Sequence, residues 1–307
     1  MILKNNIKVS VCVVVYNQKN YIRQCLQGIV DQQTSFDFEV IVSDDCSTDG
    51  TDLIINEFAE KYPKLIKPII HNKNIGPYEN YIFAHNQAVG KYIAHLDGDD
   101  LAFPSKLEMQ AKFLDQNKTH VVVWHRMETF NDEGRFKSIG LQNLEEVVDV
   151  MNIEQEDLLR FGTLGFHSSI MYRASCRLSK NEPEKKFLDY YAAVGFLDYG
   201  KAANLSQVLG GYRFNSNQST ASKKRFMGMS FSSVRTLYLS HLKIFIIKYP
   251  HFRGAIFSNL LFNAMIDLYR FRPTVFGFAF LAAKNVCLNE IVHFQSHVKK
   301  VLKLKSF

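Results

Sequence analysis

Cysteines and long apolar runs are scarce in this chain, and each scarcity excludes a class of protein. The five cysteines among 307 residues are scattered, with no CxxC pair and no cysteine–histidine cluster. Neither a disulfide framework nor a zinc site is therefore expected, and the pattern fits a reducing cytoplasm. The compact apolar stretch 275–283 is too short to span a bilayer. The first residues lack an apolar segment of signal-peptide length, so we expect a cytoplasmic protein.

Acidic residues are almost absent from the C-terminal part. From residue 222 onward, 14 lysines and arginines stand against only Asp267 and Glu290, a net charge of +12. The first 221 residues carry a net charge of −5. Such an asymmetry indicates two regions with different roles, a globular domain over 1–221 and a basic helical region over 222–307.

Buried strands and amphipathic helices alternate over the first 115 residues or so. Runs of β-branched and other apolar residues predict strands, and segments with apolar residues at helical spacing lie between them. This alternation is typical of βαβ units and predicts an α/β fold with a parallel sheet. The predicted strands are 7–15, 38–42, 65–70 and 91–96.

Polar residues cluster where each of these strands ends. In parallel α/β sheets, ligands bind beyond the carboxyl ends of the strands, so these clusters predict one binding edge. The clusters are Tyr16-Asn17, Asp44-Asp45, His71-Asn72 with Asn74, and Asp97-Gly98-Asp99-Asp100.

The last of these clusters crowds three carboxylates behind an apolar strand. Buried carboxylates repel one another, and a divalent cation would compensate them. Oxygen ligands of this kind suit Mg²⁺ or Mn²⁺. The alternative is an exposed acidic turn that caps a helix beginning near Pro104.

The order and spacing of these motifs over residues 8–115 resemble those of the family 2 glycosyltransferases with the GT-A fold. The resemblance implies a Rossmann-like, mostly parallel central sheet with helices on both faces. It also implies an inverting enzyme that uses nucleotide-diphosphate sugars, with 1–115 as the nucleotide-sugar half and 116–221 as the acceptor half. The matching segments are 13–17, 42–51, 74–76, 88–100 and 104–110, with weaker matches at 167–173 and 211–213.

The resemblance assigns residues to the nucleotide sugar. Asp44 matches the carboxylate that accepts the base N–H, although an Asp here could instead cap the following helix. Tyr16 and Asn17 would border the base, and Asn74 lies in a matching loop. Arg213 would pair with the diphosphate, or would cap a sheet edge.

The resemblance also implies that Asp97, Asp99 and Asp100 form the DxD segment, which binds the ribose and a divalent metal at the diphosphate. We favour Asp99 as the direct ligand of Mn²⁺ or Mg²⁺, assisted by Asp97 or Asp100.

Inverting transfer needs a general base for the acceptor hydroxyl. By its position in the family pattern, Asp189 is our candidate, and Asp198 is its rival. His167 and Trp124 are weaker candidates for the acceptor side, because packing alone could explain either residue.

The pattern of apolar residues over 226–304 predicts three or four helices in the C-terminal region. Basic residues flank its apolar faces, and this pattern is typical of a helix that lies on an anionic membrane surface. The alternative is a bundle that caps the domain or forms a homodimer. No nucleic-acid-binding module is recognisable, so nucleic acid is not an expected partner. The basic residues near the end are Lys299, Lys300, Lys303 and Lys305.

Together these features predict a peripheral enzyme on the inner face of the cell membrane. It would transfer a sugar, preferably from a UDP-sugar, to a hydroxyl of a glycan or lipid-linked glycan, in the assembly of a bacterial surface polysaccharide. One alternative is a nucleotidyltransferase, but the segment 16–19 lacks the glycines that such an enzyme needs after its first strand. Another is an inactive scaffold that binds a membrane or a partner.

Overall fold

A computed structural model gives two compact units, which interleave along the chain. It describes residues 7–131, 133, 136–141, 143–178, 189–214, 231–270, 274–285 and 288–304. Unit 1 comprises Met1–Gly140, Gly165–Lys185 and Tyr199–Phe214. Unit 2 comprises Leu141–Leu164, Lys186–Asp198 and Asn215–Phe307. The charge pattern predicts one boundary after residue 221, but two earlier segments, 141–164 and 186–198, group with the C-terminal helices.

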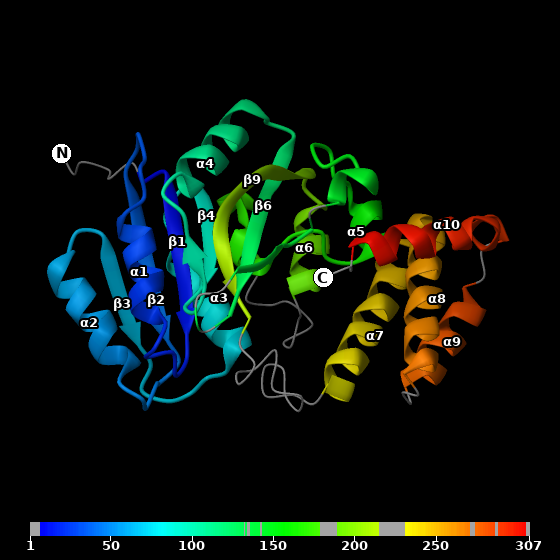
Figure 1. Ribbon diagram of the computed structural model, residues 1–307, viewed down its shortest axis with the longest axis horizontal. Coiled ribbons are helices and arrows are strands. Elements are labelled where there is room, and N and C mark those ends of the chain that lie inside the picture. The colour runs from blue at the N-terminus through cyan, green and yellow to red at the C-terminus, as the bar shows by residue number, and fades with distance from the viewer. Residues whose placement is uncertain are drawn as a thin grey trace. The chain divides into compact units, whose positions relative to one another are not determined.

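Unit 1 is built on one nine-stranded sheet with the order β3-β2-β1-β4-β8-β6-β9-β5, and β7 pairs with β6 (Figure 1). Strands β3, β2, β1 and β4 run parallel, as do β6 and β9, whereas β8 runs antiparallel to both β4 and β6. The strands are β1 Val9–Val15, β2 Phe38–Asp44, β3 Ile66–Ile70, β4 Tyr92–Asp97, β5 Leu101–Ala102, β6 His120–Phe130, β7 Phe136–Ile139, β8 Met171–Arg173 and β9 Lys201–Arg213.

Helices cover both faces of this sheet, so the predicted α/β class is confirmed. Helices α1 (Ile22–Val30), α2 (Thr51–Lys61) and α4 (Lys106–Gln116) bury their apolar sides in one continuous core with β1, β2 and β4. Helix α3 (Pro77–Gln87) packs on the opposite face, where the Cys12 thiol of β1 contacts the Ala84 carbonyl at 3.6 Å. Because β1 is buried on both faces, it reads as a nearly continuous apolar run.

Sheet register places two of the predicted site residues. Strand β1 lies between β2 and β4, with Val15 opposite Asp44 and Val14 opposite Asp97. The two carboxylates therefore end neighbouring strands on either side of β1, at the carboxyl edge where the sequence predicts the binding site.

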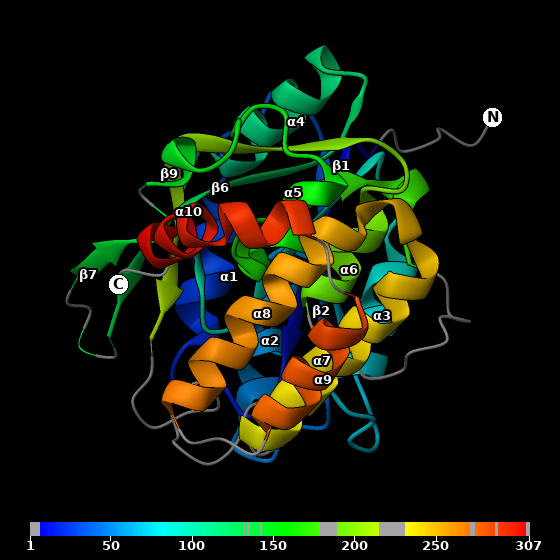
Figure 2. The same ribbon diagram turned by 90° about the vertical axis from the view of Figure 1, so that its right-hand side faces the viewer.

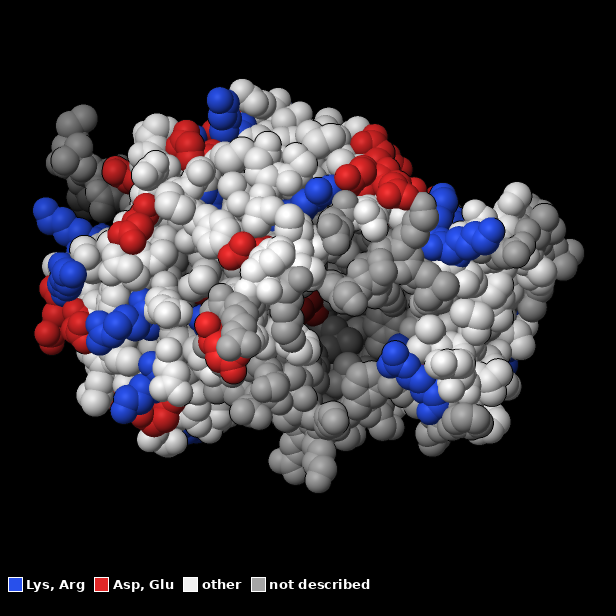
Figure 3. Space-filling model, in the orientation of Figure 1, with Lys and Arg blue, Asp and Glu red and all other residues white. Residues whose placement is uncertain are grey.

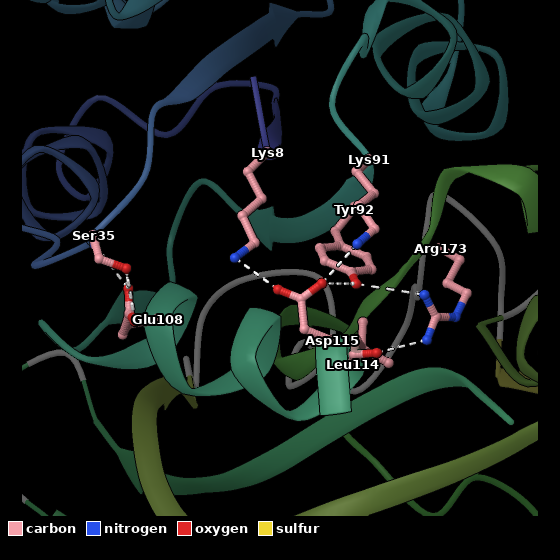
Figure 4. A network of polar contacts seen from close by, with 8 residues as sticks. All are labelled: Lys8, Ser35, Lys91, Tyr92, Glu108, Leu114, Asp115 and Arg173. Carbon is pink, nitrogen blue, oxygen red and sulfur yellow. Dashed lines mark hydrogen bonds and ion pairs between the residues drawn. The ribbon is translucent and has the colours of Figure 1, made fainter. Parts of the chain in front are cut away.

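The opposite end of the sheet is fastened by a network around Asp115 of α4 (Figure 4). The Asp115 carboxylate accepts from Lys8 at 2.7 Å, from Lys91 at 2.6 Å and from the Tyr92 hydroxyl at 2.8 Å. Arg173 of β8 donates to the Leu114 carbonyl at 2.6 Å. These contacts tie β1, β4 and β8 to the same helix end.

One short segment differs from its sequence expectation. Polar and apolar residues alternate in part over 166–172, and this pattern predicts a half-buried strand. In the structure, His167–Ser169 form a 3-10 turn (η2) and only Met171–Arg173 join the sheet. The main chain turns because the Ser169 N–H and hydroxyl both donate to the Phe166 carbonyl. The buried Lys106 ammonium donates a hydrogen bond to the Ser168 carbonyl at 2.6 Å. This carbonyl therefore bonds to a side chain instead of to a neighbouring strand.

Unit 2 is helical. Within it, α7, α8 and α9 pack side by side, and α10 crosses α8 (Figure 2). Partly buried ion pairs join its helices, among them Arg160 with Glu290 and Arg235 with Asp267. In the described part of the chain, no helix combines the length and apolarity needed to cross a bilayer. The helices are α5 Gln155–Phe161, α6 Asp189–Phe196, α7 Phe231–Lys248, α8 Arg253–Tyr269, α9 Thr274–Lys284 and α10 Leu288–Leu304, with 3-10 turns at Leu144–Glu146 and Pro250–Phe252.

Candidate active site

Asp97 is the last residue of β4, and each of its carboxylate oxygens has a hydrogen-bond partner in the protein. His95 Nε2 lies 3.2 Å from Oδ1, and the Ser168 hydroxyl lies 3.3 Å from Oδ2 while also accepting from the Asp97 N–H at 3.0 Å. Burial alone would raise the pKa of Asp97. The hydrogen bond from His95, with a smaller contribution from Ser168, outweighs burial and lowers this pKa to about 2. Asp97 is therefore an ionised, oriented carboxylate at the sheet edge.

Asp99 and Asp100 lie in the turn between β4 and β5 and are poorly compensated. Burial, with repulsion from Asp97, raises the pKa of Asp99 to about 7. Burial and the charges of Asp99 and Asp97 raise the pKa of Asp100 well above its ordinary value. Asp100 Oδ1 accepts from the Arg213 N–H at 2.8 Å, but Oδ2 is buried with no hydrogen-bond partner among the described residues. The turn thus carries more negative charge than its neighbours neutralise.

Two buried cations stand behind this turn. Arg213 of β9 donates through Nε to the Asp99 carbonyl at 3.0 Å and through Nη2 to Gln24 at 2.7 Å. Its guanidinium also lies over the rings of Tyr21 and Phe130. This geometry positions the main chain of the turn.

Lys106, the second cation, received no role from sequence reasoning. It opens α4 and is 2% exposed, and burial lowers its pKa to about 8 although the nearby acids oppose this shift. The signal that could have found it is its place in the matched segment 104–110, directly after the acidic turn.

The residues of the acidic turn fit a divalent cation. The ligand atoms are all oxygens, and one buried carboxylate oxygen has no hydrogen-bond donor among the described residues. Burial, together with repulsion among the carboxylates, raises the pKa values of Asp99 and Asp100. Such a set suits Mg²⁺ or Mn²⁺. A second donor set overlaps it, because one ligand atom each from His95, Asp97 and His167 lie within 4.8 Å of one another.

The loops after β1 and β2 meet beside this turn. The Asn17 N–H donates to the Ser47 hydroxyl at 2.8 Å, and the Asn17 side chain accepts from the Thr48 N–H at 2.8 Å. Asn17 adopts a left-handed φ of 52°, which Asn tolerates better than most residues. Asp44 is fully buried, and both its oxygens contact Ser47. Tyr16 is exposed at the rim.

Asp45 organises the neighbouring loop, a role that the sequence analysis does not assign. Its carboxylate accepts from the Ile75 N–H at 2.7 Å and from the Gly76 N–H at 3.0 Å. The Asn74 amide donates to the Asp45 carbonyl at 3.2 Å. The predicted residue Asn74 is therefore brought to the same edge as Asp44.

The two acceptor-side candidates have different surroundings. His167 in η2 is half-buried, and its ring centroid lies 3.9 Å from that of His95, so it adjoins Asp97. Trp124 of β6 is 1% exposed, and Gly165 leaves space for its indole, since a Cβ there would lie 2.3 Å from the ring. The structure thus places His167 at the site and Trp124 in the core of unit 1.

The candidate base and its rival both belong to unit 2. Asp189 is the first residue of α6 and is half-buried. Asp198 pairs with Lys248 at 2.7 Å and accepts from the Tyr249 hydroxyl and the Gln155 amide, each at 2.8 Å. Its carboxylate therefore connects helices of unit 2.

A cavity of about 580 Å³ adjoins Arg213 within unit 1. Its wall combines amide, carboxylate and aromatic side chains, which can hydrogen-bond sugar hydroxyls and contact the apolar face of a sugar ring. The residues that line it are Gln24, Gln27, Gly28, Leu101, Glu128, Phe130, Glu133, Phe136 and Arg213.

Similarity to known proteins agrees with this geometry. The chain is 35% identical over 170 residues to the putative glycosyltransferase EpsE of Bacillus subtilis, covering 55% of this chain and 57% of that protein. It is 40% identical over 126 residues to an uncharacterized protein of Mycobacterium tuberculosis, covering 41% of this chain and 36% of that protein. The chain thus spans between about a third and somewhat over half of these relatives.

A solved structure shows the same fold. The crystal structure of S. aureus TarS residues 1–349 in complex with UDP-GlcNAc aligns with 97% of this chain and 81% of that one, with a TM-score of 0.63 and 22% identity. Residues 10–175 match the family model described as glycosyl transferase family 2. Since this match covers more than half of the chain, the protein has the GT-A fold predicted from its sequence and belongs to glycosyl transferase family 2.

Proposed function

We propose that this chain transfers a sugar from a nucleoside-diphosphate sugar, preferably a UDP-sugar, to a hydroxyl of a glycan or lipid-linked glycan, with inversion and with a divalent metal ion. The observation that carries the proposal is the acidic turn at the sheet edge, where three carboxylates crowd together and one buried oxygen of Asp100 has no hydrogen-bond partner among the described residues. The UDP-GlcNAc bound to TarS supports a nucleotide-sugar donor.

Under this proposal, different acidic residues would bind different parts of the donor. Asp97 is ionised and oriented, so it suits hydrogen bonds from ribose hydroxyls, and Asp44 would accept the N–H of a uracil base. Asp99, with Asp97 or Asp100, would hold Mg²⁺ or Mn²⁺. When bound, the ion would stabilise the negative charge that develops on the departing diphosphate. Lys106 and Arg213 would stabilise the conformation of the turn through their hydrogen bonds to the Ser168 and Asp99 carbonyls.

Thermal shift measurements test the donor assignment. UDP-, GDP- and dTDP-sugars are added to the protein with and without Mn²⁺. We expect the largest rise in melting temperature with a UDP-sugar plus Mn²⁺, and no such rise in Asp99→Asn. If no nucleotide stabilises the native protein, the donor assignment fails. Metal-dependent hydrolysis of the donor, lost in Asp99→Asn, would exclude an inactive scaffold.

For the acceptor we propose Asp189 as general base. Asp189 holds the position of the general base in the family pattern, and as the first residue of α6 it is partly exposed. Asp189→Asn should abolish transfer, because an amide cannot take the proton of the acceptor hydroxyl, while UDP affinity by calorimetry stays unchanged. Asp198→Asn, the matched control, should mainly lower stability. Normal turnover in Asp189→Asn would show that another group is the base.

We further propose that unit 2 docks on an anionic membrane surface. The α8–α9 hairpin exposes Leu268 (64%), Tyr269 (82%), Phe276 (77%) and Phe280 (63%). Exposed large apolar side chains that gather on one part of a surface can mark an interaction site. Arg270 follows this patch in sequence, and the Lys284 ammonium lies 4.4 Å from the Phe280 ring centroid.

Charge favours lipid as the occupant of this surface. Between residues 253 and 285 the one acidic residue is Asp267, and it is buried against Arg235. Figure 3 shows Lys and Arg, rather than Asp and Glu, on the visible face of the C-terminal helices. Apolar side chains flanked by cations are typical of helices in the bilayer interface.

Vesicle flotation tests the docking proposal. The protein should float with vesicles that contain phosphatidylglycerol and should not float with pure phosphatidylcholine. Phe276→Ser combined with Phe280→Ser should abolish flotation, whereas Phe136→Ser, which changes an exposed phenylalanine of unit 1, should not. A dimer by light scattering that the double variant converts to a monomer would assign this face to a second copy instead.

A further inference from the structure

A buried chain of hydrogen bonds runs beneath the nucleotide site and ends on Asp97. The Tyr172 hydroxyl of β8 lies 2.6 Å from His85 Nδ1 of α3. His85 Nε2 lies 3.0 Å from His95 Nδ1, and His95 Nε2 lies 3.2 Å from Asp97 Oδ1. Tyr172, His85 and His95 are at most 1% exposed. Three elements of unit 1 therefore contribute to the orientation of one carboxylate.

The donors and acceptors in this chain follow from its geometry. An ionised carboxylate only accepts, so His95 must carry a proton on Nε2. A neutral imidazole carries one proton, so His95 Nδ1 is an acceptor when Nε2 is protonated. The single proton between the two imidazole rings therefore belongs to His85 Nε2. His85 Nδ1 in turn accepts from the Tyr172 hydroxyl. Each contact thus fixes the tautomer of the next ring.

Packing fixes the ring planes as well. The Tyr81 ring stacks on His85 with centroids 3.8 Å apart and an interplanar angle of 24°. If His85 could not donate to His95 Nδ1, the His95 proton could move to that nitrogen. The lone pair of Nε2 would then face the Asp97 carboxylate, and the two groups would repel each other.

From this geometry we infer that His85 and Tyr172 are positioning residues of the donor site, which act through His95 to hold Asp97 in the orientation that receives the nucleotide and its metal. The inference rests on the proposed function, because it concerns the nucleotide that Asp97 binds. Outer partners of metal-site and carboxylate ligands typically change affinity or activity 10–100-fold when they are removed.

Two variants of His85 separate hydrogen bonding from packing. His85→Leu cannot donate, and we expect Mn²⁺-dependent UDP affinity, measured by calorimetry, to fall about 10-fold. His85→Gln can donate through its amide, so it should recover most of that loss. Tyr172→Phe should have a smaller effect in the same direction. Ile82→Ala removes a buried side chain from the same helix without touching the chain, and it should lower the melting temperature but leave UDP affinity unchanged.

Histidine tautomers give a readout that a purely structural role would not change. In long-range ¹H–¹⁵N spectra of the ¹⁵N-histidine-labelled native protein, His85 and His95 should both be protonated on Nε2. In His85→Leu, the His95 signal should move toward the Nδ1 tautomer. An unchanged His95 tautomer, or equal losses of affinity in His85→Leu and His85→Gln, would overturn the inference. If the native protein binds no UDP at all, the proposed function fails, whereas the spectra still decide whether the chain exists.

Discussion

At the residue scale, the site depends on one buried ammonium group. Lys106 donates to the Ser168 carbonyl, and its charge lies near those of Asp97 and Asp100. Removing one partner from a buried group of opposite charges leaves the other charges uncompensated, which typically costs about 3–5 kcal/mol. Lys106 therefore stabilises the acidic turn before any metal binds.

Replacing this lysine tests that role. Lys106→Met should lower the free energy of unfolding in urea by about 3–5 kcal/mol, and millimolar Mn²⁺ should restore part of the loss, because the ion would replace the missing positive charge. Lys112→Met, an exposed change on the same helix, should have little effect. A normal urea midpoint for Lys106→Met would contradict this role.

The residues that sequence could and could not assign differ in a physical way. Asp44 and Asp97 could be placed at one edge because strand alternation and parallel pairing put them there. Lys106 and Asp45 could not be assigned roles, since their partners are main-chain groups of loops whose conformation no pattern in the sequence specifies. Similarly, nothing in sequence indicates that His85 and His95 share a hydrogen bond across two elements.

At the scale of elements, the network around Asp115 fastens three strands to α4. Burial opposes ionisation of Asp115, but hydrogen bonds from Lys8, Lys91 and Tyr92 more than offset burial and hold its pKa well below the usual value. A carboxyl with a depressed pKa in the folded state stabilises the protein above the pKa of the unfolded chain. That contribution is lost as pH falls below about 4.

The matching experiment compares stability at several pH values. Asp115→Asn should be less stable than the native protein at pH 7, and the difference should shrink steadily below about pH 4. Because the group is partly exposed, 1 M NaCl should also reduce the difference. A difference in unfolding free energy that is constant between pH 7 and pH 2 would show that the charge of Asp115 has no part in it.

Helix α7 contains a second group that should make stability depend on pH, in a higher pH range than Asp115 does. His241 is fully buried beside Tyr191, and neither ring nitrogen has a hydrogen-bond partner among the described residues. Burial lowers its pKa to about 4, whereas the unfolded chain protonates near 6.5. The unfolded state therefore binds more protons between these values, and stability falls as pH drops through this window.

Removing the imidazole should flatten that dependence. His241→Phe should lose less stability than the native protein between pH 6.5 and pH 4, by up to about 3 kcal/mol. Chemical denaturation at both pH values measures the difference, and His251→Phe serves as an exposed control. Identical pH profiles for His241→Phe and the native protein would contradict the argument.

At the scale of the whole molecule, the interleaving of the two units could not be predicted from sequence. Charge counting places a boundary near residue 221, but α5 belongs to the helical unit, where it packs on α8 and its Arg160 pairs with Glu290. These contacts join residues that lie far apart in the sequence, 130 positions for Arg160 and Glu290, and neither periodicity nor composition indicates them. Truncation after residue 225 would therefore expose the buried side of α5, so point variants on the α8–α9 hairpin test membrane docking more cleanly.

The charge asymmetry also predicts how docking depends on salt. The C-terminal part carries +12 and the remainder −5, so attraction to anionic lipid should be strong at low ionic strength. Flotation with phosphatidylglycerol vesicles should weaken markedly between 20 mM and 500 mM NaCl, since the screening length falls severalfold. Salt-independent flotation would mean that apolar insertion alone holds the protein on the vesicle.

The register of β1 has a consequence for engineering. Asp44 and Asp97 end strands that flank β1, so their main-chain separation is about two inter-strand spacings, roughly 10 Å. Hydrogen bonds between the strands set this main-chain distance, so a side-chain substitution at either position does not change it. If Asp44 and Asp97 have the proposed roles, base preference could be redesigned at Asp44 alone, without changing the distance from Asp44 to the residue that binds ribose and diphosphate.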